Sequence, residues 1–418
     1  MNSSVRCGRL AAVAAACLRV AFDVTAQTNS VVIWTASGHS NGVAGLAVSA
    51  DGSVVASAGW DGTIRLWKAA DGSAQGILSN PSARVSAVAF SPDGRLLASL
   101  SDDAMLRLWS LASRTLITNI AGVARSLGSE NSVVFSPDGA LVAAGVGGTN
   151  GVGLWRVSDG SRVGSLLGGG SGTEWIAFSP DGAFLAAAGG YRGIDATIKV
   201  WRVVNRALVK TISTSNEYGV RQLAFSPDGA FLASGAEPNA NFPAAVELWR
   251  VSDWARLDRI PIQGRYLAFS PDGTLLAIAR GDPVGRGIAV DLWHVPGANL
   301  ARSLTELTPN TGLVGPVVFS PDGSRLFVGG HISRNTVNGT VFQGLVSAVS
   351  APTMITAVKA STSQITIGLS GGPGRYQLQK STNLRGDWTN AGEPVSVRQL
   401  SIPASDPRAF FRAVEISE

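Results

Sequence analysis

The chain has 418 residues, a formal net charge of +5, and 45% hydrophobic but only 15% charged residues. This length favours more than one folding unit, and the composition excludes a disordered chain or a coiled coil. Fifty glycines indicate many tight turns, so we expect an all-β protein. The basic residues are scattered along the chain, which argues against a nucleic-acid-binding surface.

Residues 1–26 have the pattern of a secretory signal peptide. Arg6 and Arg9 precede an apolar run that starts at Leu10, and Val24-Thr25-Ala26 forms a small-residue cleavage site. No apolar run approaches the roughly 20 residues of a membrane span. We therefore expect an exported protein, either periplasmic or secreted.

Both cysteines, Cys7 and Cys17, lie in this segment, so disulfides and cysteine-ligated metals are not expected in the mature chain. Cleavage would also lower the net charge from +5 to +3. Because Arg19 interrupts the apolar run, an Ala-rich helical extension stays open as an alternative. A lipoprotein signal ending at Cys17 is a further alternative.

A turn of the form Ser-Pro-Asp-Gly recurs along the rest of the chain at intervals of 42 to 50 residues. Proline presets the second turn position, and glycine takes the left-handed conformation that closes a hairpin. Apolar strand-like runs flank each copy, and this uniform apolarity favours sheets packed on both faces. The repeated aspartates are Asp51, Asp93, Asp138, Asp181, Asp228, Asp272 and Asp322.

A third strand of the repeat ends in tryptophan. Six of the eleven tryptophans occupy this one position, which predicts that they form a core between sheets. They are Trp67, Trp109, Trp155, Trp201, Trp249 and Trp293.

With Gly38-His39 upstream of it, the segment from Ala58 to Trp67 resembles a WD40 repeat, and the resemblance extends over residues 31–347. It implies a seven-bladed β-propeller at 27–350, closed by an N-terminal strand at 31–34 that completes the last blade. The resemblance also implies a hydrogen-bond network in the first blade through His39, Ser57, Asp61 and Trp67. The third to seventh blades lack its residues, so we expect them to be held mainly by apolar packing.

The repeat stops after Pro352, and residues 352–418 show separate strand-like runs divided by Gly, Pro and Asn. This segment predicts a small β-sandwich. The runs from Tyr376 to Leu384 and from Phe410 to Val414 resemble a fibronectin-III-like module found on secreted bacterial proteins.

Gly38-His39-Ser40-Asn41-Gly42 matches the nucleophile elbow of serine hydrolases, but that motif needs a following helix, and a strand is expected here. Three dispersed histidines offer no metal cluster, and the turn aspartates have a structural role. We expect no enzyme activity, cofactor or metal. A lactonase-like propeller with inward-facing metal ligands stays an alternative, as does a carbohydrate-binding module of the cell envelope.

In WD40 propellers, a contact position at the channel mouth lies seven residues before the turn aspartate. In this chain it is held by Ala44, Ser86, Asn131, Glu174, Arg221, Arg265 and Gly315. Loops between the second and third strands project at the same mouth, and their tips carry Trp60, Tyr191 and Arg192.

Packing in so apolar a strand does not require charged residues. We therefore predict a binding surface for a protein or peptide at the mouth, formed by Trp60, Asn131, Glu174, Tyr191, Arg192, Arg221 and Arg265. A solvated channel in which Glu174 pairs with an arginine and nothing binds stays an alternative. We expect a monomeric scaffold with a protein partner, without nucleic acid and without a membrane span.

Overall fold

The computed structural model divides the chain into two compact units, one from Ser30 to Ser350 and one comprising Met1–Asn29 and Ala351–Glu418. In the first unit it describes residues 32–79, 83–123, 132–146, 151–167, 173–189, 196–215, 219–236, 244–281, 288–304, 313–336 and 339–350. In the second it describes strands within 354–416. The predicted signal peptide at 1–26 lies outside the described residues, so it stays a prediction.

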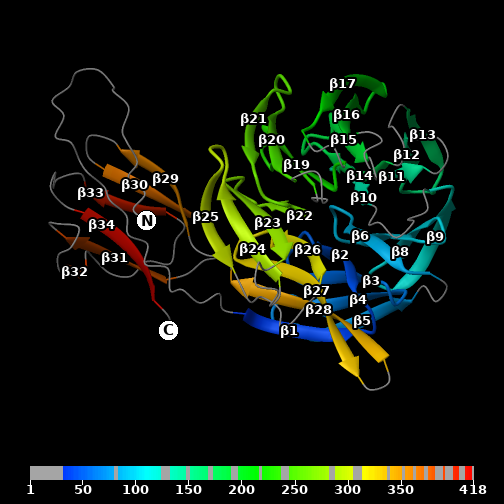
Figure 1. Cartoon of the computed structure of the whole chain (residues 1–418), viewed down its shortest axis with the longest axis horizontal. Helices are drawn as coiled ribbons and strands as arrows, with labels where there is room; N and C mark the ends of the chain where they lie inside the picture. The colour runs from blue at the N-terminus through cyan, green and yellow to red at the C-terminus, as the bar shows by residue number, and fades with distance from the viewer. Residues whose placement is uncertain are drawn as a thin grey trace. The chain divides into compact units, whose positions relative to one another are not determined.

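In the described part of the larger unit, six antiparallel sheets are each built from four strands that are consecutive in sequence (Figure 1). The first three are β2 (Val43–Val48), β3 (Val54–Gly59), β4 (Thr63–Lys68) and β5 (Ala74–Ser79); β6 (Val85–Phe90), β7 (Leu96–Ser101), β8 (Met105–Ser110) and β9 (Thr115–Ala121); and β10 (Val133–Phe135), β11 (Leu141–Val146), β12 (Gly151–Arg156) and β13 (Arg162–Leu166). The next three are β14 (Thr173–Phe178), β15 (Phe184–Gly189), β16 (Thr197–Arg202) and β17 (Ala207–Ser213); β18 (Gln222–Phe225), β19 (Phe231–Gly235), β20 (Val246–Arg250) and β21 (Arg256–Ile260); and β22 (Tyr266–Phe269), β23 (Leu275–Gly281), β24 (Ile288–His294) and β25 (Asn299–Leu304).

A further four-stranded sheet is composite, because it joins strands from the two ends of the unit. Its order is β1 (Val32–His39), β28 (Gly339–Ser350), β27 (Arg325–Thr336) and β26 (Leu313–Phe319). β1 runs antiparallel to β28, with Thr35 opposite Ser347. Six sheets of consecutive strands are thus present against the seven blades expected, since the last repeat has no fourth strand of its own and its sheet takes β1 instead.

The first strands of successive sheets contact one another in a closed series. β2 contacts β6, and the contacts continue through β10, β14, β18 and β22 to β26, which contacts β2 again. Figure 1 shows the sheets of this unit arranged around a common centre. The arrangement is propeller-like, and each first strand is the innermost strand of its sheet.

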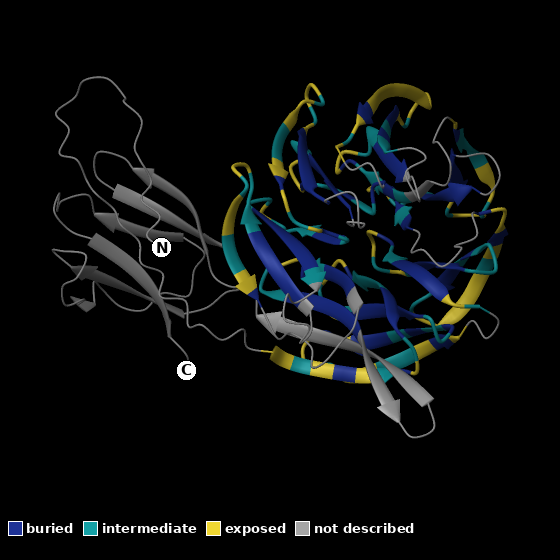
Figure 2. Ribbon diagram, viewed as in Figure 1, coloured by how far each residue is buried: buried dark blue, intermediate teal, exposed yellow. Residues whose placement is uncertain are grey.

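Apolar side chains pack between neighbouring sheets and form the core. One cluster joins Leu106 and Leu108 of β8 with Val142 of β11 and Trp155 of β12. Five of the six repeat tryptophans are buried, as predicted, and Trp293 is half-buried. Burial falls from the inner strands to the outer ones, where β17 is mostly exposed (Figure 2).

The recurrent turns close the hairpins between first and second strands in the way that the sequence predicts. In the second sheet Ser91 Oγ donates to Asp93 Oδ1 over 2.6 Å and accepts the backbone N–H of Leu96 over 2.9 Å. Gly94 has a left-handed φ of 69°. The turn aspartate therefore has a structural role, as expected.

The smaller unit contains two three-stranded sheets among its described residues. One has the order β29 (Met354–Ala360), β30 (Gln364–Ser370), β33 (Gln399–Pro403). The other has the order β32 (Thr389–Asn390), β31 (Arg375–Ser381), β34 (Phe410–Ile416). A β-sandwich of the fibronectin-III-like type stays a prediction.

Candidate functional site

Each sheet has two chemically different ends. At one end the first strand begins opposite the last residues of the second strand, as where Val85 pairs with Ser101. We call this the mouth end, because the predicted binding residues Trp60, Arg221 and Arg265 lie there. The recurrent turns lie at the other end, which we call the turn end.

Three of the predicted binding residues have described side chains: Trp60, Arg221 and Arg265. Glu174 lies on β14, but its side chain is outside the described part. Asn131, Tyr191 and Arg192 are outside the described residues altogether. Their membership of a common surface stays a prediction.

Trp60 contributes to a mixed polar and aromatic cluster between the first two sheets. It lies in the β3–β4 loop, its backbone N–H donates to Gly42 O over 2.9 Å, and the Arg84 guanidinium lies 5.8 Å from its ring centroid. That distance allows a cation–π interaction. The exposed Arg84 precedes β6 directly.

Asp102, in the β7–β8 loop of the second sheet, belongs to the same cluster. Its backbone N–H donates to Arg84 O over 3.0 Å. Burial raises the pKa of the Asp102 carboxyl, the positive charge of Arg84 opposes that effect, and Asp103 adds to it. The sequence interpretation missed Arg84 and Asp102, although Arg84 precedes the contact position at Ser86 by only two residues.

Arg221 and Arg265 lie at the mouth end of adjacent sheets, directly before β18 and β22. Arg221 N donates to Gly235 O over 2.7 Å, and the Arg265 guanidinium lies 5.6 Å from the ring centroid of Tyr266. A hydrogen bond of 2.5 Å from Leu267 N to Gln222 Oε1 joins the two strands. The strands that follow Arg221 and Arg265 are therefore held together at the mouth end.

The first sheet contains the hydrogen-bond network that the resemblance implies. His39 Nδ1 lies 3.0 Å from Asp61 Oδ1, and His39 Nε2 lies 2.7 Å from Ser57 Oγ. Trp67 Nε1 donates to Ser57 Oγ over 2.8 Å. A Cβ on Gly59 would collide with His39 and Asp61, which explains glycine at this position.

Asp61 is ionised within this network. Burial by itself would raise the pKa of its carboxyl, but the hydrogen bond and charge of His39, with hydrogen bonds from Thr63 and Ser40, hold that pKa well below its ordinary value. Thr63 Oγ1 donates to Asp61 Oδ1 over 2.7 Å, and Ser40 N donates to Asp61 Oδ2 over 2.8 Å.

This Ser-His-Asp geometry resembles a hydrolase triad, but its serine cannot be a nucleophile. Ser57 is 0% exposed and His39 1% exposed, and Ser57 Oγ already accepts a hydrogen bond from Trp67. Ser40, the serine of the elbow-like motif, precedes strand β2 rather than a helix. The network has a structural role: it holds β3 and β4 of the first sheet against the end of β1 and the β1–β2 connection.

Among the described residues, no group of three or more His, Cys, Asp or Glu side chains could hold a metal ion. None of them forms a helix long and apolar enough to cross a membrane.

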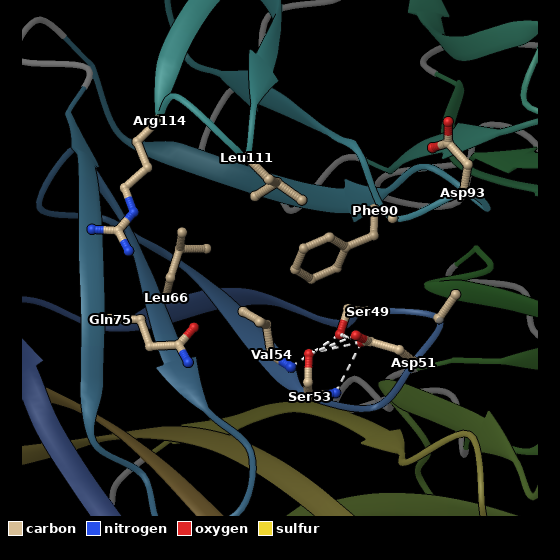
Figure 3. Close-up of a pocket in the computed structure, with 12 residues that line it drawn as sticks. Ser49, Asp51, Ser53, Val54, Leu66, Gln75, Phe90, Asp93, Leu111 and Arg114 are labelled. Carbon is tan, nitrogen blue, oxygen red and sulfur yellow. Dashed lines mark hydrogen bonds between the residues drawn. The ribbon is translucent and has the colours of Figure 1, made fainter.

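A cavity of about 310 Å³ lies at the turn end between the β2–β5 and β6–β9 sheets (Figure 3). Leu66, Phe90 and Leu111 give it an apolar lining, and Asp51, Gln75, Asp93 and Arg114 add polar groups. The sequence interpretation missed this pocket. Its residues come from two repeats and two turn types, so no local motif joins them.

Four segments of the chain match the WD domain, G-beta repeat family: residues 30–68, 72–110, 161–202 and 206–238. Each segment begins near the outer strand of one sheet and continues into the inner strands of the next. The chain thus carries WD40 repeats in a propeller-like, all-β arrangement. Comparison with curated proteins found no match.

Proposed function

We propose that this protein is an exported, non-catalytic scaffold that binds an acidic segment of a partner protein at the mouth end of its propeller. WD40 propellers generally mediate protein–protein interactions. The observation that carries the proposal is the placement of Arg221 and Arg265 directly before two adjacent innermost strands, which the Gln222–Leu267 hydrogen bond joins. Arginine offers paired N–H donors that match a carboxylate.

The Trp60–Arg84 pair gives the same surface an aromatic anchor. Trp and Arg are enriched among the residues that dominate binding energy at protein interfaces. In the proposal, Asn131, Glu174, Tyr191 and Arg192 complete this surface and restrict which acidic segments fit. The two arginines recognise carboxylates, while Trp60 covers an apolar side chain of the partner.

The scaffold is proposed to have seven blades, with the composite β1–β28–β27–β26 sheet as the seventh. The pairing of β1 with β28 supports this, because it lets the ends of the unit complete one sheet and leaves no gap in the series of inner strands. Export follows, in this proposal, from the signal-like residues 1–26. The proposed role of residues 352–418 is a fibronectin-III-like module.

The test is quantitative affinity capture from a cell-envelope extract with the parent and the Arg221→Ala/Arg265→Ala variant. The matched control is Arg156→Ala/Arg250→Ala, which removes the same charge from the turns after third strands at the turn end. There the two arginines form exposed pairs with Asp159 and Asp253. Urea unfolding verifies the fold of each variant.

We expect a partner that the parent and the control retain and that the mouth-end variant loses at least tenfold. A synthetic peptide from an acidic region of that partner should then bind the parent, with an affinity that falls as salt rises. Equal capture by all three proteins would contradict binding at the mouth end, as would equal loss in both variants.

A further inference from the structure

The turn-end pocket has opposite charges on its two sides. Its acidic side carries Asp51 from the β2–β3 turn and Asp93 from the β6–β7 turn, and Figure 3 shows Gln75 and Arg114 on the other side. Leu66 and Phe90 lie between them. A volume of about 310 Å³ is at the lower end of the range of small-molecule sites, about 300–1,000 Å³.

Both carboxyl groups on the acidic side are ionised at neutral pH. Hydrogen bonds from Ser49 and Ser53 lower the pKa of Asp51. A hydrogen bond from Ser91 and one from the backbone of Arg95 lower the pKa of Asp93. The same bonds hold both carboxylates in place as acceptors for a cationic ligand group. Asp93 Oδ2 also lies 3.9 Å from Nε of the exposed Arg95, and a ligand ammonium group would compete with this weak surface pair.

The opposite side presents a positive charge. Arg114 occupies the turn between β8 and β9 with a left-handed φ of 56°, and its side chain lies over Gly76 of the neighbouring sheet. A Cβ added at Gly76 would lie 3.2 Å from the nearest Arg114 atoms, so the arginine side chain would have to shift by a few tenths of an ångström. Within the described part of the chain its guanidinium has no ion-pair partner.

The corresponding position two sheets further on shows what is particular to this pocket. There Arg206 has a left-handed φ of 59° and lies over Gly164, as Arg114 lies over Gly76. Val163 stands where the first site has Gln75, and it packs against the apolar cluster of its sheets. The same contact between sheets, an arginine over a glycine, therefore occurs at Arg206 without an amide side chain beside the arginine.

We propose that the turn-end pocket binds a short zwitterionic peptide of two or three residues. The peptide's carboxylate pairs with Arg114 and accepts a hydrogen bond from Gln75. Its ammonium group lies between the Asp51 and Asp93 carboxylates, and an apolar side chain packs on Phe90 and Leu66. The pocket has opposite charges at its two sides and apolar side chains between them. A matching ligand must therefore carry its own two charges at opposite ends, as an extended di- or tripeptide does. This site is independent of the mouth-end surface.

The test is isothermal titration calorimetry of the full chain with the dipeptide Leu-Leu. N-acetyl-Leu-Leu lacks the ammonium group, and Leu-Leu amide lacks the carboxylate. Arg114→Gln removes the proposed carboxylate partner, and its matched control is Arg206→Gln. Asp93→Asn removes one ammonium partner, and Asp181→Asn is its control, because Asp181 has the same turn role with Ser179.

We expect saturable binding of Leu-Leu by the parent and by both controls. Each capped peptide should bind at least tenfold more weakly, and Arg114→Gln and Asp93→Asn should each weaken Leu-Leu binding about tenfold through loss of a charge-assisted hydrogen bond. Absence of saturable Leu-Leu binding overturns the proposal. Binding that persists after both caps, or that Arg114→Gln and Arg206→Gln reduce equally, overturns it as well.

Discussion

The repeat tryptophan has very different surroundings in the first and last of the six consecutive-strand sheets. Trp67 Nε1 donates to Ser57, which also contacts His39. Trp293 Nε1 is buried without a hydrogen-bond partner within the described part of the chain. Ile278 of β23 occupies the position in the last sheet that Ser57 of β3 occupies in the first. Both sheets nevertheless form, so the polar network is not what makes a sheet of this protein.

The intermediate sheets show that the network can be lost in parts. Trp109 Nε1 donates to Ser99 Oγ over 2.9 Å, and Trp249 Nε1 donates to Ser234 Oγ over 3.0 Å. In the second sheet Arg107 pairs with Asp103, the counterpart of Asp61, in place of a histidine. What all of these sheets share is the apolar inner face and the turn. The hydrogen-bond network adds local stability where its residues are present.

The largest effect on this contrast is expected from Asp61→Ala. It removes the carboxylate beside the buried His39, whose Nδ1 keeps Thr63 Oγ1 at 3.1 Å, and it leaves the backbone N–H of Ser40 without its acceptor. Together these losses should lower the free energy of unfolding by roughly 3 kcal/mol. Asp103→Ala, in the equivalent position of the second sheet, should cost about 1 kcal/mol or less, because its ion pair is partly solvated. Urea unfolding measures both. Equal costs would show that the first sheet gains nothing particular from its network.

Gly59→Ala should be the next most destabilising change, by about 2 kcal/mol, since the new methyl group collides with His39 and Asp61. The collision predicts strong coupling. In a His39→Ala background, Gly59→Ala should cost at least 1 kcal/mol less, which a double-mutant cycle measures. Additive costs would place the strain against Asp61 or in the backbone of β3 rather than against His39.

Trp67→Phe and Trp293→Phe compare the two extremes directly. Trp67→Phe deprives Ser57 of a buried donor and should cost about 1–2 kcal/mol. Trp293→Phe removes an N–H that has no partner, so its loss of packing is offset and its cost should stay within about 0.5 kcal/mol. Thermal unfolding of both variants tests the difference. A larger cost for Trp293→Phe would mean that ring size matters more than hydrogen bonding at this position.

The propeller-like arrangement could be predicted from the sequence because its determinants are local and repeated. Each Ser-Pro-Asp-Gly turn predicts the hairpin between a first and a second strand, and each run that ends in tryptophan predicts a third strand. The network around His39 could be predicted through the resemblance, since one repeat retains all four of its residues. The number of sheets is harder to predict from the repeats, because the composite sheet depends on the pairing of β1 with β28, about 300 residues away.

The pocket could not be predicted for a physical reason. Arg114 and Gln75 are close only because the turn of one sheet lies over Gly76 of its neighbour. Likewise, Arg84 is placed by its ring contact with Trp60, which belongs to another sheet. Some contacts between sheets recur with the repeat, as Arg206 over Gly164 does, but Gln75 has Val163 as its counterpart and is not part of the repeat. A repeat-based interpretation assigns the shared positions and misses residues that are particular to one pair of sheets.

The charge of Asp61 also makes the stability of the chain depend on pH. The pKa of Asp61 is lower in the folded chain than the ordinary value of 3.8, so folding favours its charged form. This contribution is complete well above pH 3.8 and is lost as the pH falls below 3.8 toward the folded pKa. Asp61→Asn removes it.

The difference in unfolding free energy between parent and Asp61→Asn should therefore be constant near neutral pH and should shrink steadily as the pH falls from about 4 to about 2. Urea unfolding across this range, with Asp103→Asn as the control, measures the convergence. A constant difference between parent and variant would show that His39 and Asp61 interact in a way that does not depend on the carboxylate charge. In that case the contrast between the first and last sheets would rest on the hydrogen bonds of Ser57 with Trp67 and His39 and on packing, rather than on the charge of Asp61.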